Sequence, residues 1–374
     1  MVRATGPGLL AALVLPLVIV LVPARAAAFG TIDTGGQNRE HERITRAAVA
    51  CAAGPESGRA CFEPRSADQL AGHGKRFGAV GSPDLTEPLD PAAHCDDADY
   101  LAGDYPRTRD RATASLPDCV DHLRGRFLEA VDEAGNLLDA DGAIVPAAVT
   151  LDADCEFDAA QEKRSKCRSL EGFGRALHGV QDFYSHSNWT DEADPARPVG
   201  ADNPPGLGLP APSPVFDLRG TGAPSVPDGL STGCFVLHDS VPGVEKCALR
   251  VTHAGLNKDL GLIDPNTGEA TDPATPRGRV GGNFARAVAG AVEETRRQWR
   301  DLRSELEDRY GARKASLMVC ALRRDDPVAD CRIRGVPTVL AAGVLVGVVG
   351  LVLFGLRRQA VRGRRQAVRR RRAG

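Results

Sequence analysis

The sequence predicts an all-α body, and three observations lead to that class. Apolar residues recur at helical spacing in several long segments. Runs in which polar and β-branched residues alternate, as they do in strands, are nearly absent. The long stretches between the helical segments are too rich in Pro and Gly to form either element. We therefore expect a helical bundle with long surface loops.

Four segments carry the helical pattern, with apolar residues three or four positions apart along each. These predicted helices span residues 40–53, 119–138, 169–186 and 283–310. Residues 191–229 form a Pro- and Gly-rich loop after the third helix, and residues 262–282 form a second loop of similar composition. Loops of this length serve either as walls that contact a substrate or as plain surface insertions, and the composition fits both.

The N-terminus has the pattern of a secretory signal. Residues 1–28 contain one early Arg, a long apolar run and then PARAAA, which offers small residues for cleavage. Cleavage after Ala28 would leave Ala26 and Ala28 at the positions that the peptidase reads. Phe29 would then carry the new amino terminus of the exported chain.

The C-terminus has the pattern of a membrane anchor. Residues 336–356 carry no charge over the length that a helix needs to cross a bilayer, and the basic tail 357–374 follows. A buried core helix is the alternative, although core helices are seldom so uniformly apolar. We expect one transmembrane helix in the cell membrane, with the body, residues 29–335, outside and the tail in the cytoplasm.

The charge of the body bears on its partners. The chain holds 47 Lys and Arg against 49 Asp and Glu. Eleven of the Arg residues lie in the signal and the tail, where there is no acid, so the body holds 36 basic and 49 acidic residues and a net charge of −13. A surface of this sign repels polyanions, which disfavours nucleic acid as a partner.

Ten cysteines lie in the body, and an even number in an exported chain indicates disulfides. Ten cysteines permit many connectivities, of which we expect pairing in sequence order. No CxxC pair is present to bind zinc, and oxidised thiols leave no Cys nucleophile. The expected pairs are Cys51–Cys61, Cys95–Cys119, Cys155–Cys167, Cys234–Cys247 and Cys320–Cys331.

The segment GRALHGVQDFYSHSNW, residues 174–189, contains candidate metal ligands. Steps of four place His178, Asp182 and His186 within ~80° of arc on one face of a helix. The two His backbones would lie ~12 Å apart, so two ions with Asp182 between them fit better than one. Zinc suits imidazole and carboxylate donors. A solvated helix face is the alternative, against which the apolar and aromatic neighbours argue.

This segment resembles the signature of the Het-C family, and the wider pattern resembles the superfamily of zinc-dependent phospholipase C and single-strand nucleases. The specific match covers 16 residues, with weaker similarity over most of residues 29–310. FGTI, EHERITR and THAGLNKD are similar to pieces of the actinobacterial CinY-type secreted proteins. The resemblance implies a helical bundle that holds three zinc ions.

The resemblance also implies a ligand set for two of these ions. The first ion would have four ligands, one of which bridges to the second ion. The second would also take the amine and carbonyl of the first mature residue. The residues implied are Asp84, His94, His178 and Asp182 for the first ion, and Asp182, His41 and Phe29 for the second.

A third ion would be held by His186 and His253, with two departures from the superfamily pattern. Three residues separate Asp182 from His186, where the superfamily has five. Asn257 stands where a glutamate ligand is usual, and Asp259 could substitute, although it would lie two positions further round a helix. We therefore expect one to three ions.

The remaining candidates are ordinary polar residues or supporting groups. His73, His122 and His238 match nothing in the superfamily pattern, and we expect them to be ordinary polar positions. Acidic neighbours follow His94 in the sequence and either orient an imidazole or form a solvated turn. These neighbours are Asp96, Asp97 and Asp99.

The expected activity is zinc-dependent phosphodiester hydrolysis of the phospholipase C type, with Asp84 as general base. The anchor and the acidic body favour phospholipid or another surface phosphoester as substrate. A non-catalytic surface protein, in which the metal site is structural, vestigial or used to bind a partner, is the main alternative. An accessory protein that matures an exported peptide is a third.

Overall fold

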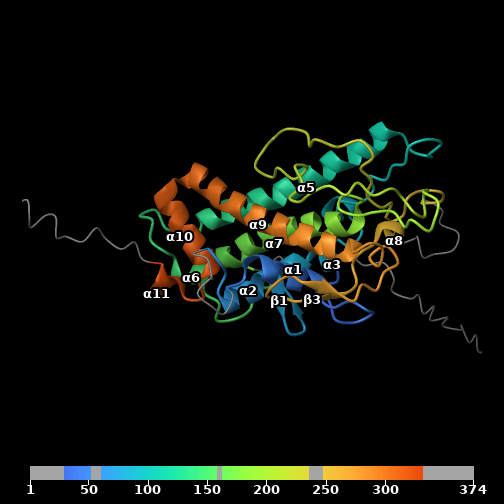
Figure 1. The fold of residues 1–374 in the computed structure, drawn as a ribbon. Coiled ribbons are helices and arrows are strands. Elements are labelled where there is room, and N and C mark those ends of the chain that lie inside the picture. Colours follow the sequence, from blue (N-terminus) through green and yellow to red (C-terminus); the bar gives the residue numbers. More distant parts are fainter. Residues whose placement is uncertain (1–28, 52–59, 158–161, 236–246, 332–374) are drawn as a thin grey trace, which may run out of the picture. The chain divides into compact units, whose positions relative to one another are not determined.

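The computed structural model describes residues 29–51, 60–157, 162–235 and 247–331, which form mostly helices (Figure 1). The predicted all-α class is confirmed. The predicted signal peptide and transmembrane helix lie outside the described residues. Among the residues that are described, no helix is long and apolar enough to span a membrane. The chain divides into a compact unit that ends at Val328 and a second one that begins at Ala329.

In order, the elements are α1 (Glu40–Val49), α2 (Pro64–Ala71), β1 (Gly72–His73), β2 (Arg76–Phe77), the 3₁₀ helix η1 (Ala79–Gly81), α3 (Pro83–Thr86), α4 (Pro91–His94), α5 (Arg109–Gly135), α6 (Pro146–Val149), α7 (Ser165–His186), α8 (His253–Leu256), β3 (Leu262–Ile263), β4 (Ala270–Thr271), α9 (Asn283–Tyr310), α10 (Ala312–Arg323) and α11 (Pro327–Asp330). The longest connection between elements is the one from α7 to α8. β1 pairs with β2, and β3 with β4, both antiparallel.

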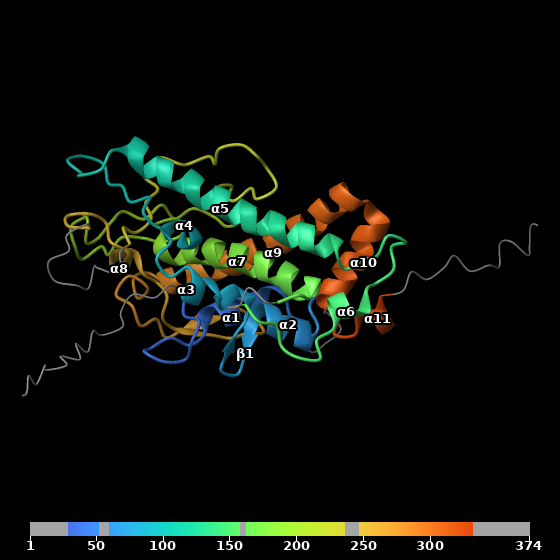
Figure 2. The same ribbon diagram turned by 180° about the vertical axis from the view of Figure 1, so that it is seen from behind.

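Helix α7 is the central element of the first unit. It packs chiefly against α5 and α9, while η1, α4 and α2 contact the rest of its surface. In both views α7 runs between α5 on one side and α1 and α2 on the other (Figures 1 and 2). Twenty of its 22 residues are buried. A helix buried on all sides is normally apolar, so the polar residues of α7 need partners inside the protein.

Two glycines of α7 let neighbouring backbone approach closely. A Cβ atom at Gly174 would lie 2.5 Å from the carbonyl carbon of Ala79 in η1. A Cβ atom at Gly179 would lie 2.7 Å from the carbonyl oxygen of Ala93 in α4. Both distances are shorter than real Cβ contacts, so glycine is what allows η1 and α4 to lie directly against this helix.

The predicted helices form with shifted ends. α5 begins ten residues before the predicted start, because the Thr108 side chain accepts a hydrogen bond from the Arg111 backbone N–H and caps the helix there. It continues through Pro117. α10 was not predicted. The loop 191–229 contains no helix or strand, as expected, whereas the loop 262–282 forms the β3–β4 hairpin.

Disulfides follow the predicted sequence order. Cys320 and Cys331, the last two cysteines, are both disulfide-bonded as well. Each bridge closes a short stretch of chain. It therefore reduces the conformational freedom of the unfolded chain and fixes the two ends of a loop together. The four pairs with measured geometry are Cys51–Cys61, Cys95–Cys119, Cys155–Cys167 and Cys234–Cys247.

Candidate metal centre

Asp182 lies at the centre of a buried group of histidines. Its Oδ2 atom lies 2.9 Å from His94 Nδ1 and 3.0 Å from His178 Nε2. Asp84 completes this group, with Oδ1 3.6 Å from His178 Nε2. α7 supplies His178 and Asp182, one turn apart, while α3 and α4 bring Asp84 and His94 against it. The four residues predicted to hold the first ion are therefore together.

The other oxygen of Asp182 faces a second group. Asp182 Oδ1 lies 3.1 Å from Nε2 of His41, which projects from α1. Phe29 is fully buried, and its ring lies edge-on to the His41 ring at 5.9 Å between centroids. The predicted first residue of the exported chain is thus next to this group. Asp182 has one oxygen toward each group, which is the arrangement that a bridging carboxylate needs.

Hydrogen bonds fix the orientation of the imidazoles. His178 Nδ1 donates to the Val80 carbonyl at 2.9 Å, and His41 Nδ1 donates to Gln181 Oε1 at 2.8 Å. Gln181 has its amide nitrogen committed to Thr45, so its oxygen is the acceptor. In both histidines Nε2 is left facing Asp182, which is how metal-binding imidazoles are held in proteins. The role of Gln181 was not predicted from the sequence.

The hydroxyl of Thr31 supports the most exposed carboxylate of the first group. It donates to Asp84 Oδ2 at 2.5 Å. The Asp84 side chain is 20% exposed, whereas those of Asp182 and His178 are fully buried. Asp84 is therefore the carboxylate of this group that solvent reaches most readily.

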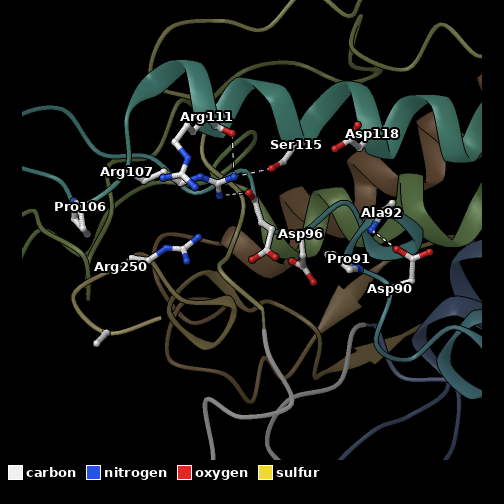
Figure 3. A pocket seen from close by; sticks show the side chains of 12 residues that line it. Asp90, Pro91, Ala92, Asp96, Pro106, Arg107, Arg111, Ser115, Asp118 and Arg250 are labelled. Carbon is white, nitrogen blue, oxygen red and sulfur yellow. Dashed lines mark hydrogen bonds between the residues drawn. The ribbon is translucent and has the colours of Figure 1, made fainter. Parts of the chain in front are cut away.

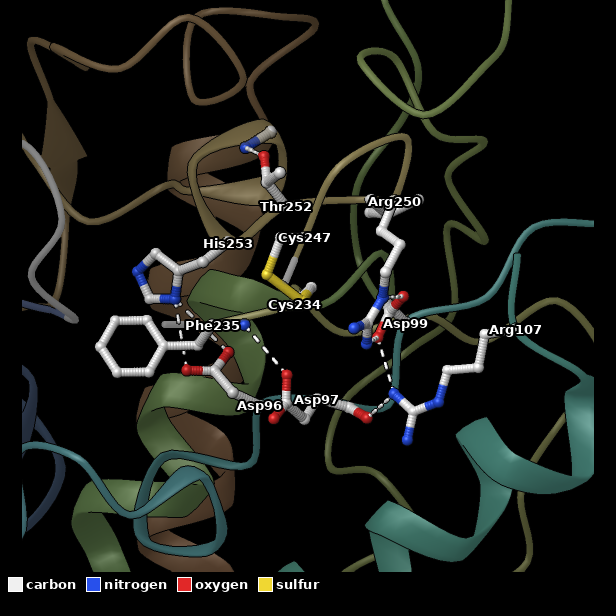
Figure 4. Close-up of a disulfide and its surroundings, with 12 residues drawn as sticks. Asp96, Asp97, Asp99, Arg107, Cys234, Phe235, Cys247, Arg250, Thr252 and His253 are labelled. Carbon is white, nitrogen blue, oxygen red and sulfur yellow. Dashed lines mark hydrogen bonds and ion pairs between the residues drawn. A yellow bond between two sulfur atoms is a disulfide. The ribbon is translucent and has the colours of Figure 1, made fainter. Parts of the chain in front are cut away.

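A third group lies one turn further along α7. It consists of Asp96, His186 and His253, all buried. His253 Nδ1 lies 3.3 Å from Asp96 Oδ2, and the rings of His186 and His253 are 3.8 Å apart between centroids. Figure 4 shows the Asp96 carboxylate directed at the His253 ring. Asp96 therefore takes part in the group itself, in addition to lying two residues after His94 in the sequence.

Asp259 contacts His186 of the third group, but from a loop and not from the helix that was expected. α8 ends at Leu256, so Asp259 is not on a helix with His253. Its Oδ1 lies 2.8 Å from His186 Nε2. Asn257, which stands where the superfamily has a glutamate, accepts a hydrogen bond from the Asp259 backbone N–H at 2.8 Å and so holds that turn. His186 points into the centre despite its different spacing from Asp182.

Several donor atoms of these groups lack hydrogen-bond partners. Among the described residues, nine buried side-chain nitrogen or oxygen atoms have none; four of the nine belong to the three groups, and a fifth belongs to Asp259, which contacts His186. Two of the five, His41 Nε2 and Asp182 Oδ1, face each other at 3.1 Å without forming a hydrogen bond. Buried polar atoms are nearly always satisfied in proteins, so a bound cation would explain this concentration. The five are His41 Nε2, Asp182 Oδ1, His186 Nδ1, His253 Nε2 and Asp259 Oδ2.

The electrostatics of the groups favour a cation. Burial alone would raise the pKa of Asp182, but the neighbouring His178 and His41 lower the pKa well below its usual range. Burial likewise opposes protonation of His94, yet Asp182, with Asp84 and Asp96, raises the pKa of His94 to about 9. The carboxylates thus impose a strong negative potential. Imidazole and carboxylate donors without thiolate are compatible with zinc and with other divalent metals.

The other predicted polar residues lie outside these groups. His73 lies 3.4 Å from Asp154 on the surface. His122 lies 3.5 Å from Glu87, in a partly exposed cluster with Asp90. His238 is outside the described residues.

A solvated turn after His94 is not what forms. Asp96 is 2% exposed and Asp99 is fully buried. Asp99 accepts hydrogen bonds from Tyr105, Arg107 and Arg250. Figure 4 shows the two arginines beside it. These bonds fix the residues that follow Asp96 in the sequence. The bond from Arg250 also connects them to the segment next to the Cys234–Cys247 disulfide.

A hollow of about 570 Å³ opens beside the third group. Asp96 lines it together with Asp90, Arg107 and Arg250 (Figure 3). This volume lies within the range of small-molecule sites. The hollow therefore gives the centre an adjacent space in which a ligand could lie.

Comparison with known proteins adds no family. No family model, curated protein or solved structure matches the chain.

Proposed function

We propose that the protein is a zinc-dependent phosphodiester hydrolase of the phospholipase C type. The observation that carries this proposal is Asp182, whose two oxygens face separate groups of histidines at 2.9–3.1 Å. Adjacent ions that share a carboxylate suit phosphoryl chemistry. The proposal includes export by a signal peptide and one C-terminal transmembrane helix, as the ends of the sequence suggest.

The proposed roles of the residues follow from how exposed each side chain is. Zinc, when bound, lowers the pKa of a coordinated water and stabilises negative charge on a phosphoryl group. Asp182, His41 and His178 hold the centre together and stay out of solvent. Asp84 is more accessible and accepts the proton of the attacking water, while the Thr31 hydroxyl keeps its carboxylate in place.

The substrate that we propose is a phospholipid or another surface phosphoester. The predicted anchor would hold the body close to lipid. The net charge of −13 on the exported body repels nucleic acid. The hollow beside Asp96 offers room for a head group.

The test uses the full-length protein in detergent. We would measure its metal content by elemental analysis and its hydrolysis of bis(4-nitrophenyl) phosphate and of a short-chain phosphatidylcholine. At least two zinc ions per chain are expected, with hydrolysis that a chelator removes and zinc restores. Asp84→Asn should lower the rate by roughly 10²-fold or more, since it removes the proposed general base. A folded, metal-free protein would overturn the proposal.

Burial of the ligands favours a second candidate, a non-catalytic surface protein with a structural metal site. The side chains of His178, His186 and Asp182 are fully buried, and His94 is 7% exposed. Structural sites are closed in this way, whereas catalytic sites keep a position open. Tight zinc binding without hydrolysis of either diester, and unfolding when zinc is removed, would support this candidate over the hydrolase.

A further inference from the structure

The backbone of Gly233 and Cys234 connects all parts of the third group. The Gly233 N–H donates to the His186 carbonyl at 3.0 Å, and the Gly233 carbonyl accepts from the Asp97 N–H at 2.9 Å. The Cys234 carbonyl accepts from the His253 N–H at 3.0 Å. His186 and His253 belong to the group, and Asp97 directly follows its third member in the sequence. This two-residue segment therefore sets where the ligands lie relative to one another.

One disulfide fixes this segment. Cys234 is joined to Cys247, which lies shortly before His253 in the sequence. The Cys234 N–H also donates to the Val251 carbonyl at 2.8 Å. Figure 4 shows the disulfide and its surroundings, with His253 among them. Neither cysteine lies in a helix or a strand, so the covalent bond and a few hydrogen bonds are what hold the segment against the chain of His253.

A second disulfide holds the acidic ligand of the group. Cys95 stands directly between His94 and Asp96 in the sequence, and it is joined to Cys119 in α5. α4 ends at His94 and has a single turn. A helix this short is not stable by itself. The bond to the long helix α5 therefore fixes the turn from which His94 and Asp96 point into different groups.

The third group depends on such bonds more than the other two groups do. The first and second groups meet along α1 and α7, which are regular helices packed into the fold. The third group takes only His186 from a helix of that kind, because Asp96 follows the one-turn α4 and His253 begins the one-turn α8. Without the two bridges, Asp96 and His253 would lose the bonds that hold their segments beside His186.

We propose that the disulfides Cys95–Cys119 and Cys234–Cys247 position the ligands of the third group, so that only the oxidised chain binds its ion. This inference rests on the metal centre of the proposed function and is independent of hydrolysis. Each bridge forms when two thiols give two electrons and two protons to an external disulfide, which leaves as two thiols. Because the cytosol keeps thiols reduced, the third ion is loaded only after the chain has left it.

The coupling between the ion and the bridges acts in both directions. If the bridges raise the affinity for the ion, the bound ion stabilises the bridges by the same factor. The four cysteines are buried, with exposed fractions of 0–6%, so a reductant reaches them when the chain opens locally. An ion that binds only the folded group makes such opening rarer. Zinc should therefore slow the reduction of these two bridges.

The experiment follows reduction of the full-length protein in detergent, with zinc present or after a chelator has removed it. A phosphine reductant brings no thiol that would compete for zinc. It gives two electrons to each bridge and takes the oxygen of one water, whose protons go to the two thiols. The thiols are alkylated at intervals and assigned by peptide mass.

Cys155–Cys167 is the matched control bridge. It is also buried, and its cysteines are 12 residues apart in the sequence, against 13 for Cys234–Cys247. Cys167 lies in the first turn of α7, at the end opposite to His186. An effect of zinc on the third group alone should therefore leave this bridge unchanged.

At about ten times the zinc Kd, zinc should slow the reduction of Cys234–Cys247 and Cys95–Cys119 about tenfold and leave Cys155–Cys167 unchanged. Asp96→Asn should abolish the protection of Cys234–Cys247, because it removes a ligand of the third group. Equal rates with and without zinc at Cys234–Cys247 would overturn the proposal. The same slowing at Cys155–Cys167 would also overturn it, since zinc would then stabilise the fold as a whole. Protection that persists in Asp96→Asn would assign the effect to another group and overturn it as well.

Elemental analysis of the same samples separates this inference from the proposed function. A protein that binds no zinc overturns both. Bound zinc without protection of the bridges removes the coupling alone. Protection without hydrolysis of either diester removes the hydrolase and leaves the coupling in place.

Discussion

Asp182 carries more of the centre than any other residue, because its two oxygens face different groups. One is near His41 and the other near His94 and His178. The neighbouring histidines keep the pKa of this carboxyl low despite complete burial. A buried carboxylate that stays ionised is costly unless cations surround it, so the residue is suited to hold positive charge.

Asp182→Asn should remove at least two metal ions per chain. Asparagine offers a single neutral oxygen, and its amide nitrogen cannot serve as a ligand, so it cannot bridge. Elemental analysis of the purified variant measures the loss. His73→Gln, at a partly exposed histidine outside the three groups, is the control and should keep the full metal content. A variant with the metal content of the unsubstituted protein would contradict the bridging role.

Asp96→Asn tests the third group in the same way. One ion should be lost while those held through Asp182 remain, because Asp96 faces His253 and not His41 or His178. Asp259→Asn is the comparison, since Asp259 approaches His186 from the other side. If Asp259→Asn loses the ion and Asp96→Asn keeps it, Asp259 is the ligand and our assignment of Asp96 is wrong.

The sequence predicted the residues of this centre unevenly, for a physical reason. His178, Asp182 and His186 can be predicted from the sequence because helical spacing alone brings them to one face. Asp96 cannot be predicted in this way, since its partner His253 is 157 residues away in the sequence. Its neighbours Cys95 and Asp97 both have positive φ, 56° and 63°. The two left-handed residues turn the chain so that Asp96 points inward, and no periodic pattern in the sequence predicts such turns.

Among the helices and strands too, features that depend on local sequence were predicted and features that depend on particular contacts were not. The periodic segments became α1, α5, α7 and α9, because amphipathic patterns depend only on local sequence. The start of α5 was missed because it depends on a side-chain cap at Thr108, and the β3–β4 hairpin because two-residue strands carry no pattern. The close packing of α7 also depends on contacts with distant parts of the chain, which no local pattern predicts. Substitution of a glycine in α7 tests these contacts.

Gly174→Ala should destabilise the protein by about 1–3 kcal/mol, because the added methyl overpacks the contact with Ala79 in η1. Gly125→Ala, in the exposed face of α5 with nothing near its Cβ position, should stabilise by about 0.5–1 kcal/mol through helix propensity. Denaturant unfolding followed by circular dichroism measures both. Equal effects of the two substitutions would show that η1 does not lie directly against α7.

At the scale of the whole molecule, α7 links two different buried polar sites. His186 is at its C-terminal end, in the candidate centre. Lys166, near its N-terminal end, is fully buried and donates to Ser66 Oγ at 2.9 Å and to the Arg324 carbonyl at 2.6 Å. Three distant parts of the chain, α2, α7 and the end of α10, are thus joined through one amine.

Lys166 should make stability depend on pH. Burial lowers the pKa of its amine from 10.5 to about 7, against the opposing charges of Asp325 and Glu63, with Arg65 acting in the same direction as burial. Between pH 7 and pH 10.5 the folded amine is neutral while the unfolded one keeps its proton. The unfolded state then binds more protons, so stability rises with pH across this window.

From pH 7 to pH 9 this residue should add about 2 kcal/mol to the free energy of unfolding, at 1.36 kcal/mol per pKa unit. Lys166→Met removes the titrating amine and should flatten the rise by that amount, whereas Lys314→Met, at an exposed position of α10, should leave it in place. Denaturant unfolding at the two pH values measures the difference. The same rise in all three proteins would mean that other groups cause it and that Lys166 keeps its proton in the fold, stabilised by Asp325 and Glu63 more strongly than burial opposes it.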